Sequence, residues 1–447
     1  MGTGARLRGH LAHMRRLSGA RRWRRPLRAA PLVLAVGSAV VLAGCGADTQ
    51  TTDGRTEITM WSHSAGNPAE LEVIDRIIAD FSDSQDEYVI DAEFFPQGAY
   101  NDAIVAAATA GDLPCLLDMD GPVMPNWAWA EVITPLDLPP ELTDQFLPST
   151  VGEWEGELYS IGYGDAALSV LARRSVLEDN GIRIPTMERP WSLEEFDEAL
   201  VTLKEAGFEY AIDMGVADTG EWWAYAYSPL LQSFGGDLVD RDTFLSADGA
   251  LNGPEAVAFG EWFHSLFDRD LASRTPTAGR QDFPLGNVAL SWNGNWSAPA
   301  AFEAFGDDVL FLPPPDFGTG PKIGGASWQW GVSANCDAVE GARDYIEFSL
   351  APEYIAELSN LTGGIPATEE AAALTENYAE GGPLAVMLDY SREYALIRPP
   401  TPAYAVISSV FEKSLQDIMN GADVEGSLDR AVDQIDFNIE TNDGYGF

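Results

Sequence analysis

The chain has few basic residues beyond its first 44 positions. Nine of its 26 lysines and arginines lie in that opening segment, which holds none of the 70 aspartates and glutamates. The remainder therefore carries 17 basic residues and a formal net charge of −53. A surface of this sign repels nucleic acids and anionic membranes, and it offers no electrostatic footprint for binding phosphate groups. We therefore expect no nucleic-acid partner.

The sequence motifs of common catalytic centres are also missing. The chain has no glycine-rich phosphate loop, no His-Glu-x-x-His pair and no Gly-x-Ser-x-Gly elbow. Only His63 and His264 follow the opening segment, so acid–base chemistry would fall to carboxylates. Residues 118–121 have alternating acids but lack the third acid and the closing glutamate of a calcium loop. We expect no metal and no cofactor, whereas a pair of glycosidase carboxylates is neither indicated nor excluded.

The opening segment has the pattern of an export signal that is removed from the mature protein. Its arginines precede an apolar run, residues 32–43, that is too short to span a bilayer as a mature helix. Leu42-Ala43-Gly44-Cys45 resembles a bacterial lipoprotein box, in which Cys45 becomes the lipidated first residue. We predict a signal over residues 1–44 and a flexible tether over residues 45–55. The alternative is an ordinary secretory signal in which Cys45 is incidental.

Beyond Cys45 the chain has only two cysteines, Cys115 and Cys336. In an oxidising exterior two such thiols invite a disulfide, and two buried free cysteines are the alternative. The residues alone leave this choice open. Neither cysteine has the spaced His or Cys neighbours of a zinc site.

The 403 residues that follow the 44-residue signal exceed what one hydrophobic core usually holds, so we expect two domains. They begin with alternating strands over 57–61, 88–95 and 115–119 and helices from Pro68 to Phe81 and over 100–110. This order predicts a parallel sheet covered by helices, with binding groups in the loops beyond the carboxyl ends of the strands. Those loops contain Ser62, His63, Gln97 and residues 118–120.

Later in the chain the helix signals are stronger. Ser192 and Glu195 form a capping box, and Trp191 and Phe196 are spaced as a hydrophobic staple, which predicts a structural role for Trp191. Further helices are predicted over residues 254–268, 338–350, 404–420 and 424–435.

The segment 288–297 is the first of three tryptophan-rich candidates for a binding surface. It begins as an apolar strand and breaks at Asn293-Gly294, so Trp292 and Trp296 flank a bend. Taken alone, the residues favour a core role for both rings. The alternative is an aromatic platform beside Asn293, which suits a sugar ring.

The other two candidates are the pair Trp222 and Trp223 and the strand that contains Trp328 and Trp330. Alternation along that strand places Trp328 and Trp330 on the same face. For both candidates, core packing and a ligand-facing wall remain open alternatives.

Five segments occur in a specific order behind the lipoprotein signal. They are AGDLP at 110–114, GELY at 156–159, PWSLEEF at 190–196, WNGNW at 292–296 and RPPTPAY at 398–404. In this order, from residue 57 to about residue 437, the chain resembles extracellular solute-binding proteins of sugar-importing ABC transporters and is similar to the maltose-binding protein family.

The resemblance implies an α/β fold of the type II periplasmic-binding-protein kind, with two lobes and a ligand cleft between them. Each lobe would be a mostly parallel sheet flanked by helices. The first lobe would comprise residues 56–162 and 312–351, and the second residues 163–311 and 352–447. Trp292 has the best motif placement among the ligand-binding residues that we expect, which are Trp61, His63, Gln97, Asp118, Asp120, Trp222, Trp292, Asn293, Trp296 and Trp328.

The resemblance also bears on the cysteines. In the family topology the strand that starts at Cys115 neighbours the strand that leads to Cys336, which favours a disulfide between them. One family landmark is absent, because the usual Tyr-Asn of the first strand in the second lobe is replaced by Ala172-Arg173.

The resemblance finally implies a monomeric lipoprotein that is not an enzyme and touches the outer face of the cell membrane only through its lipid anchor. It would close on a sugar and deliver it to the permease subunits of an ABC importer, and so indirectly to their ATPase. The alternatives are a surface-anchored carbohydrate-active hydrolase and a non-catalytic adhesive lipoprotein.

Overall fold

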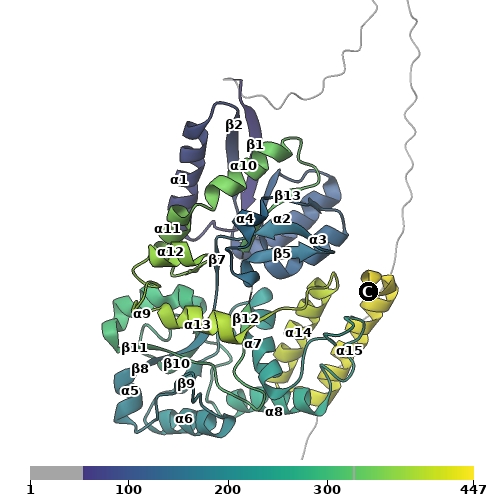
Figure 1. The fold of residues 1–447 in the computed structure, drawn as a ribbon. Helices are drawn as coiled ribbons and strands as arrows, with labels where there is room; N and C mark the ends of the chain where they lie inside the picture. The colour runs from purple at the N-terminus through teal and green to yellow at the C-terminus, as the bar shows by residue number, and fades with distance from the viewer. Residues whose placement is uncertain (1–53, 326–327) are drawn as a thin grey trace, which may run out of the picture. The chain divides into compact units, whose positions relative to one another are not determined.

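A computed structural model describes residues 54–325 and 328–447 (Figure 1). The predicted signal, Cys45 and nearly all of the predicted tether lie outside the described residues. Within the described ranges, no helix combines the length and the apolar character that crossing a membrane requires. Two larger β-sheets organise this part of the chain.

The first sheet has seven strands and contains the predicted β-α-β start. Its strands in spatial order are β2 (Tyr88–Phe94), β1 (Thr56–Ser62), β3 (Leu116–Asp120), β13 (Trp328–Ser333), β6 (Glu157–Ile161) and β5 (Val151–Trp154), with β4 (Ile133–Thr134) also paired to β13. β1 pairs in parallel with both β2 and β3, which confirms the predicted order of strands and helices. β13 runs antiparallel to β3 and β6.

The second sheet has four strands. In spatial order they are β11 (Val309–Leu312), β8 (Leu168–Arg173), β10 (Val288–Gly294) and β9 (Tyr210–Asp213). β10 is parallel to β9 and antiparallel to β8. Two short pairs complete the strands, β12 (Ile323–Gly325) with β15 (Ala395–Ile397) and β7 (Gly164–Asp165) with β14 (Ile365–Pro366).

Both larger sheets are mixed, so the prediction of mostly parallel sheets is wrong in this respect. Parallel neighbours require a crossover that returns to the same sheet, usually through a helix. β8 and β13 instead pair antiparallel with the neighbours on both of their sides.

Two helices begin at the capping residues that signal them, whereas the helix predicted over 100–110 begins earlier, at Gln97, which was expected in a loop. Asn67 accepts a hydrogen bond from the backbone N–H of Glu70 at the start of one helix, and Ser192 and Glu195 form the predicted capping box at the start of another. Trp191 is 1% exposed, and its ring centroid lies 5.9 Å from that of Phe196, so the staple is structural as predicted.

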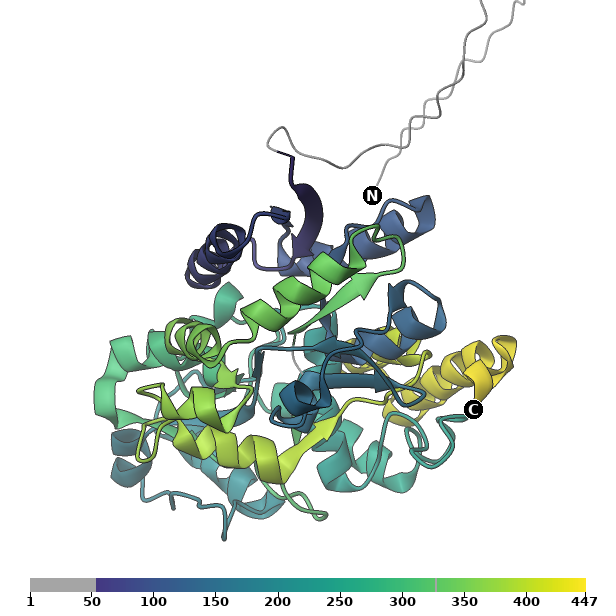
Figure 2. The same ribbon diagram turned by 45° about the horizontal axis from the view of Figure 1, so that its top comes forward.

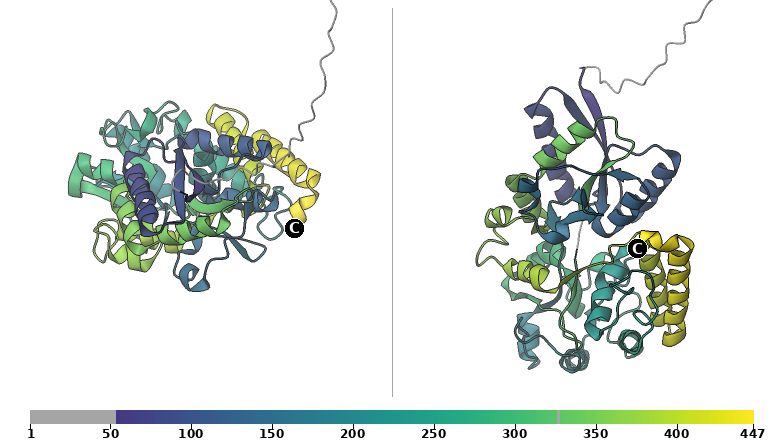
Figure 3. Two further views of the ribbon diagram at one scale, coloured as in Figure 1. Left: turned by 90° about the horizontal axis from the view of Figure 1, so that it is seen from above. Right: turned by 45° about the vertical axis from the view of Figure 1, so that its right-hand side comes forward.

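The helices flank both sheets, as Figures 1 and 2 show. Their bounds are α1 (Pro68–Ser84), α2 (Gln97–Ala110), α3 (Met124–Trp129), α4 (Pro140–Thr143), α5 (Arg174–Asp179), α6 (Leu193–Glu205), α7 (Glu221–Phe234), α8 (Pro254–Asp268), α9 (Ala298–Phe305), α10 (Val339–Ser349), α11 (Pro352–Thr362), α12 (Glu369–Ala373), α13 (Ala385–Tyr394), α14 (Tyr404–Met419) and α15 (Val424–Thr441). α1 packs against α10 and α11, and α8 packs against α7, α14 and α15. Figure 3 shows α14 and α15 side by side near the C-terminus.

The packing of the crossing segments bears on the expected lobe boundaries. Phe317 and Ile323, which the resemblance assigns to the first lobe, belong to the hydrophobic core around the second sheet. Ile355 and Leu358 of α11, assigned to the second lobe, belong to the core around the first sheet. We therefore propose that the chain returns to the first lobe after residue 325 and leaves it again near residue 372.

A disulfide joins Cys115 and Cys336, whose Cα atoms lie 4.4 Å apart. Cys115 directly precedes β3 and Cys336 lies just beyond β13, and these two strands are antiparallel neighbours. The bond therefore ties two distant segments, separated by 221 positions in the sequence, at one end of the first sheet.

Removing this disulfide is expected to lower the free energy of unfolding. A cross-link over so long a loop restricts the unfolded chain, and the loss of a native disulfide typically costs about 2–5 kcal/mol. The double variant Cys115→Ala, Cys336→Ala should show this loss in urea unfolding. Reductant should lower the urea midpoint of the wild type to that of the variant and leave the variant's midpoint unchanged. A wild-type midpoint that does not change on addition of reductant would contradict the prediction.

Candidate functional site

The carboxyl ends of β1 and β3 bring together polar side chains that the sequence predicted as neighbours. The two strands are parallel, so Ser62 and His63 at the end of β1 lie beside Asp118 of β3. Ser62 Oγ donates to Asp118 Oδ2 at 2.9 Å, and Nδ1 of His63 lies 2.5 Å from the same oxygen. The other carboxylate oxygen, Oδ1, is buried without a hydrogen-bond partner among the described residues.

His63 forms an aromatic pair with Trp328 of β13. Their ring centroids lie 3.6 Å apart, with planes 6° from parallel, and Tyr100 contacts Trp328 edge-on. Burial alone would lower the pKa of His63, but the carboxylates of Asp118 and Glu70 outweigh burial and raise it above its ordinary value. The pair therefore presents an aromatic surface next to two carboxylates that favour the protonated form of His63.

Glu70 approaches the histidine from α1. Its Oε1 lies 3.9 Å from Nε2 of His63 and accepts a hydrogen bond of 2.6 Å from the hydroxyl of Tyr163. Burial raises the pKa of Tyr163 well above its ordinary value, so this hydroxyl remains a donor. The sequence analysis did not identify Glu70 as a site residue, because an acid in the first turn of a helix is already explained by its role at the helix start.

A buried ion pair joins the first sheet to elements beside the second. Both terminal nitrogens of Arg398 donate to Asp120, each at 2.9 Å, and Nη1 also donates to Glu221 of α7 at 2.8 Å. The Arg398 side chain is 2% exposed. Burial and Glu221 raise the pKa of Asp120 despite the opposing effect of Arg398. Arg398 thus forms an electrostatic connection between the two groups of elements.

The hydroxyls of α14 complete this network. Tyr404 and Ser408 each donate to Glu221 at 2.6 Å. Next to the ion pair, Asn126 Nδ2 donates to the backbone carbonyl of Pro402 at 2.8 Å. The RPPTPAY segment at 398–404 therefore lies between the two sheets, a placement that its motif did not reveal.

The carboxyl ends of β9 and β10 and the start of α7 gather a second aromatic group. Trp222, Tyr225 and Trp296 have ring centroids 6.0–6.3 Å apart. Arg280 lies over Trp222, with its guanidinium carbon 3.4 Å from the ring centroid. Asn293, predicted as a ligand contact, is 4% exposed, and its side-chain oxygen accepts a hydrogen bond of 2.8 Å from Arg280.

Trp296 is the exposed ring of this group, with a relative accessibility of 37%. It packs closely over Gly294, where a Cβ atom would come within 2.0 Å of the indole ring. Glycine at this position therefore allows the ring of Trp296 to approach the end of β10 closely. Trp296, placed second by sequence reasoning, is the tryptophan of 288–297 that is available to a ligand.

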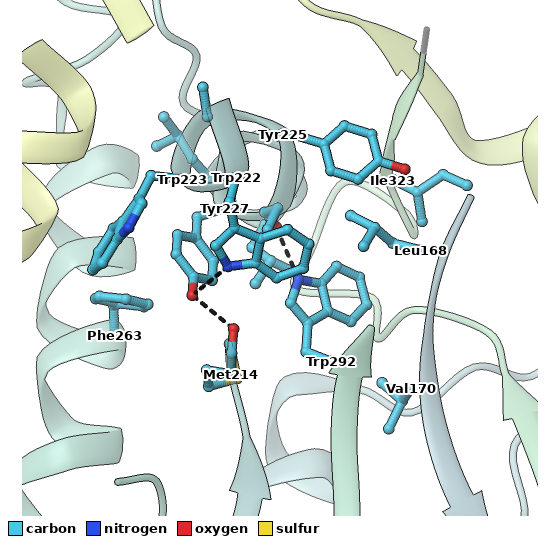
Figure 4. Packing of buried hydrophobic residues seen from close by; sticks show 14 of the residues in the cluster. Leu168, Val170, Met214, Trp222, Trp223, Tyr225, Tyr227, Phe263, Trp292 and Ile323 are labelled. Carbon is cyan, nitrogen blue, oxygen red and sulfur yellow. Dashed lines mark hydrogen bonds between the residues drawn. The ribbon is translucent and has the colours of Figure 1, made fainter. Parts of the chain in front are cut away.

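The structure places Trp292 in the core of the second sheet rather than on a wall of the site. Figure 4 shows it beneath α7, where its indole N–H donates to the carbonyl of Ala226 at 2.9 Å. Only 2% of the residue is exposed, because side chains at alternate positions of β10 point to opposite faces and this face is covered by α7. Trp222, also shown there, is 8% exposed and donates to the hydroxyl of Tyr227 at 3.2 Å.

Of the remaining predicted residues, Trp61 packs near the first aromatic pair. Trp61 is half-buried, contacts Phe95 at a tilted angle with ring centroids 4.7 Å apart, and packs on the same small cluster as Trp328. Gln97 is exposed at the first position of α2. Trp330, which shares a strand with Trp328, is core at 2% exposure.

A separate cavity of about 700 Å³ lies beside the short pair of β7 and β14, at one of the places where the chain crosses between the two lobes. Its lining comes from residues 144–149, the start of α12, α13 and β15, and it contains none of the predicted ligand residues. At its edge Asp165 of β7 accepts hydrogen bonds of 2.7 Å from both Ser149 and Ser391. These bonds connect β7 to the segment that contains Ser149 and to α13, which contains Ser391.

Residues 76–385 match the model of a protein family described as bacterial extracellular solute-binding proteins. The fold is similar to that of the cyclic alpha-maltosyl-1,6-maltose binding protein from Arthrobacter globiformis, with 22% identity, a TM-score of 0.71, and coverage of 87% of this chain and 100% of that chain. No curated protein matches the sequence.

Two further solved structures have the same fold. The GacH receptor of Streptomyces glaucescens is 16% identical, with a TM-score of 0.73 and coverage of 86% of this chain and 97% of that chain. Maltose-bound MalE3 of T. maritima is 21% identical, with a TM-score of 0.73 and coverage of 86% and 99%. These similarities establish a two-lobed α/β fold.

Replacing Arg398 is expected to destabilise the protein strongly. Arg398→Met would leave Asp120 and Glu221 buried together without their cation, and removing one partner of a buried pair costs about 3–5 kcal/mol. Urea unfolding should show a loss of that size. The matched control is Arg392→Met, whose exposed partner Glu369 predicts a loss below about 1 kcal/mol. Equal losses in both variants would contradict this prediction.

The raised pKa of His63 predicts a pH-dependent contribution to stability. A group with a raised folded pKa stabilises fully below its unfolded pKa, here near 6.5, and this contribution is lost as the pH rises through the folded value. The difference in unfolding free energy between wild type and His63→Gln should therefore be largest below pH 6 and shrink toward pH 9. A difference that is constant or grows with pH would refute this assignment.

Proposed function

Because the chain belongs to the bacterial extracellular solute-binding proteins, we propose that it captures a sugar or oligosaccharide between its two sheets and delivers it to an ABC importer. The observation that carries this proposal is the pair of aromatic walls, each with charged groups beside it. Aromatic faces cover the C–H surfaces of sugar rings, while carboxylates and guanidinium groups bind the hydroxyls.

The first wall consists of Trp328, stacked with His63, and of Trp61 close by. The unpartnered oxygen of Asp118 supplies an acceptor within the described residues. A buried acceptor without a partner is costly, so a ligand hydroxyl that donates to it would gain affinity. The second wall consists of Trp296 and the polar edge of Arg280.

Three of the similar structures support a carbohydrate ligand. They are a cyclic alpha-maltosyl-1,6-maltose binding protein, MalE3 with maltose bound, and the GacH receptor in complex with acarbose. The linkage and length of the sugar depend on the shape of the site, and we assign none to this chain.

A hinge movement at the crossings would bury the ligand between the walls. Asp165 and the β7–β14 pair lie at one crossing, and the ion pair of Asp120 with Arg398 connects the two sides. We propose that the closed form is the one that the permease recognises. Micromolar affinity, about −8 kcal/mol, would allow both capture and release.

The proposal extends to the anchor and the cellular location. Lipidation of Cys45 would hold a monomer at the outer face of the cell membrane, with residues 45–55 as a tether. Its partners would be the permease subunits and, through them, their ATPase.

A catalytic role is less well supported by the geometry. Asp118 is hydrogen-bonded to Ser62 and His63, and Asp120 is paired with Arg398, so neither carboxylate is arranged as a free acid or base. The chain is therefore proposed to bind without turnover.

Two tryptophan variants test the placement of the ligand. Trp296→Ala should weaken sugar binding at least tenfold, about 1.4 kcal/mol, because it removes an exposed stacking surface. Trp292→Ala should leave affinity nearly unchanged but lower the free energy of unfolding by about 3–5 kcal/mol, because it empties a core position. Calorimetric titration and urea unfolding measure the two effects.

The titration should first screen maltose, maltotriose, mannotriose and tagatose against the wild type. A ligand that binds the folded state must raise its melting temperature, which confirms binding independently. Failure of every saccharide to bind or stabilise the wild type would refute the proposed function. Loss of affinity in a stable Trp292→Ala variant would instead refute the placement of Trp292 in the core.

A further inference from the structure

Arg280 occupies an unusual backbone position at the edge of the second wall. It ends a short 3-10 turn, Ala278–Arg280, between α8 and β10, with φ of 56°, and Gly279 before it has φ of 69°. Residues with a side chain rarely adopt this left-handed conformation. Such a position persists only where the surroundings determine it, and it is a reason to examine what the side chain does.

Three neighbours fix the guanidinium of Arg280. Its Nε and Nη2 donate to Asp218, and its Nη1 donates to Asn293. The group lies over Trp222 at 3.4 Å and 5.7 Å from the centroid of Trp296. Planar arginine, unlike lysine, satisfies an ion pair, an amide and an aromatic face at the same time.

This arrangement changes the character of the second wall. Because the guanidinium covers one face of Trp222, a sugar cannot stack on that face. Three of the five N–H groups of Arg280 are used, so one on Nη1 and one on Nη2 remain without a partner among the described residues. The side chain is 13% exposed and lies beside the exposed ring of Trp296.

The charge of Arg280 is compensated by Asp218, and the whole chain has a net charge of −44. A carboxylated ligand at this place would meet the carboxylate of Asp218 as well as the guanidinium. A neutral hydroxyl or acetal oxygen would accept the free N–H groups without that repulsion.

We propose that Arg280 is a specificity-determining residue, which donates to the oxygens of a neutral saccharide stacked on Trp296 and disfavours acidic saccharides through its pairing with Asp218. This inference rests on the proposed function. The sequence predicted that Trp222 and Asn293 contact the ligand. This inference assigns that contact to Arg280, and Trp222 and Asn293 hold the guanidinium in place.

The test compares Arg280→Ala and Arg280→Lys with the wild type by calorimetric titration. The probes are three neutral trisaccharides, maltotriose, cellotriose and mannotriose, and the acidic trigalacturonate. Arg280→Ala should weaken the best neutral trisaccharide at least tenfold. Arg280→Lys should recover only part of this loss, because an ammonium cannot bridge Asp218 and Asn293 while lying flat on Trp222.

The matched control is Arg269→Ala, which removes a bidentate pair with Asp197 in the same part of the chain. It should leave affinity within twofold of the wild type. Asp218→Asn should shift the ratio of affinities toward trigalacturonate, a readout that loss of structure alone would not produce.

The outcomes separate this inference from the proposed function. Neutral binding that is unchanged in Arg280→Ala, or tighter wild-type binding of trigalacturonate than of every neutral trisaccharide, would overturn the role of Arg280 alone. A wild type that binds none of the four probes would overturn both.

Discussion

The buried guanidinium of Arg398 is the interaction on which the relation between the two sheets depends. It lies between Asp120 at the end of β3 and Glu221 at the start of α7, with one cation for two carboxylates. The hydroxyls of Tyr404 and Ser408 offset the second negative charge by donating to Glu221. Because a buried charge without its partner is costly, this pair fixes which strand ends face each other across the proposed ligand site.

With the strand ends so placed, the site has the same construction on both sides. On each wall a nitrogen-bearing group covers the face of an indole, His63 on Trp328 and Arg280 on Trp222. Stacking of this kind holds the group in position while its edge remains able to donate. Trp296 differs, because it is the ring left open beside such a pair. A neutral polyol, with apolar faces and polar edges, matches this alternation of open ring and donor edge.

The sequence predicted those features of the fold that depend on residues close together in the chain. The capping box at Ser192 and the parallel strands that unite His63 with Asp118 follow from neighbours in sequence and from strand order. The choice between Trp292 and Trp296 could not be made in this way. It depends on which face of β10 is covered by α7, a helix some 60 residues earlier, and on Gly294, whose missing side chain leaves room for the ring of Trp296. Motif position alone therefore favoured Trp292, which lies in the core, over Trp296, which is the more exposed ring of the two.

The sequence also could not predict the roles of Arg280 and Arg398, because their partners are far away in the chain. Arg280 is 62 residues from Asp218, and Arg398 is 278 residues from Asp120, so no spacing rule connects them. In so acidic a chain, a buried basic residue next to aromatic rings indicates the ligand site better than the surface charge does. Salt screens exposed carboxylates within about 10 Å at 0.1 M, but it reaches buried pairs far less. Ionic strength therefore acts mainly on the exposed acids, while the buried pair of Arg398 with Asp120 is screened far less.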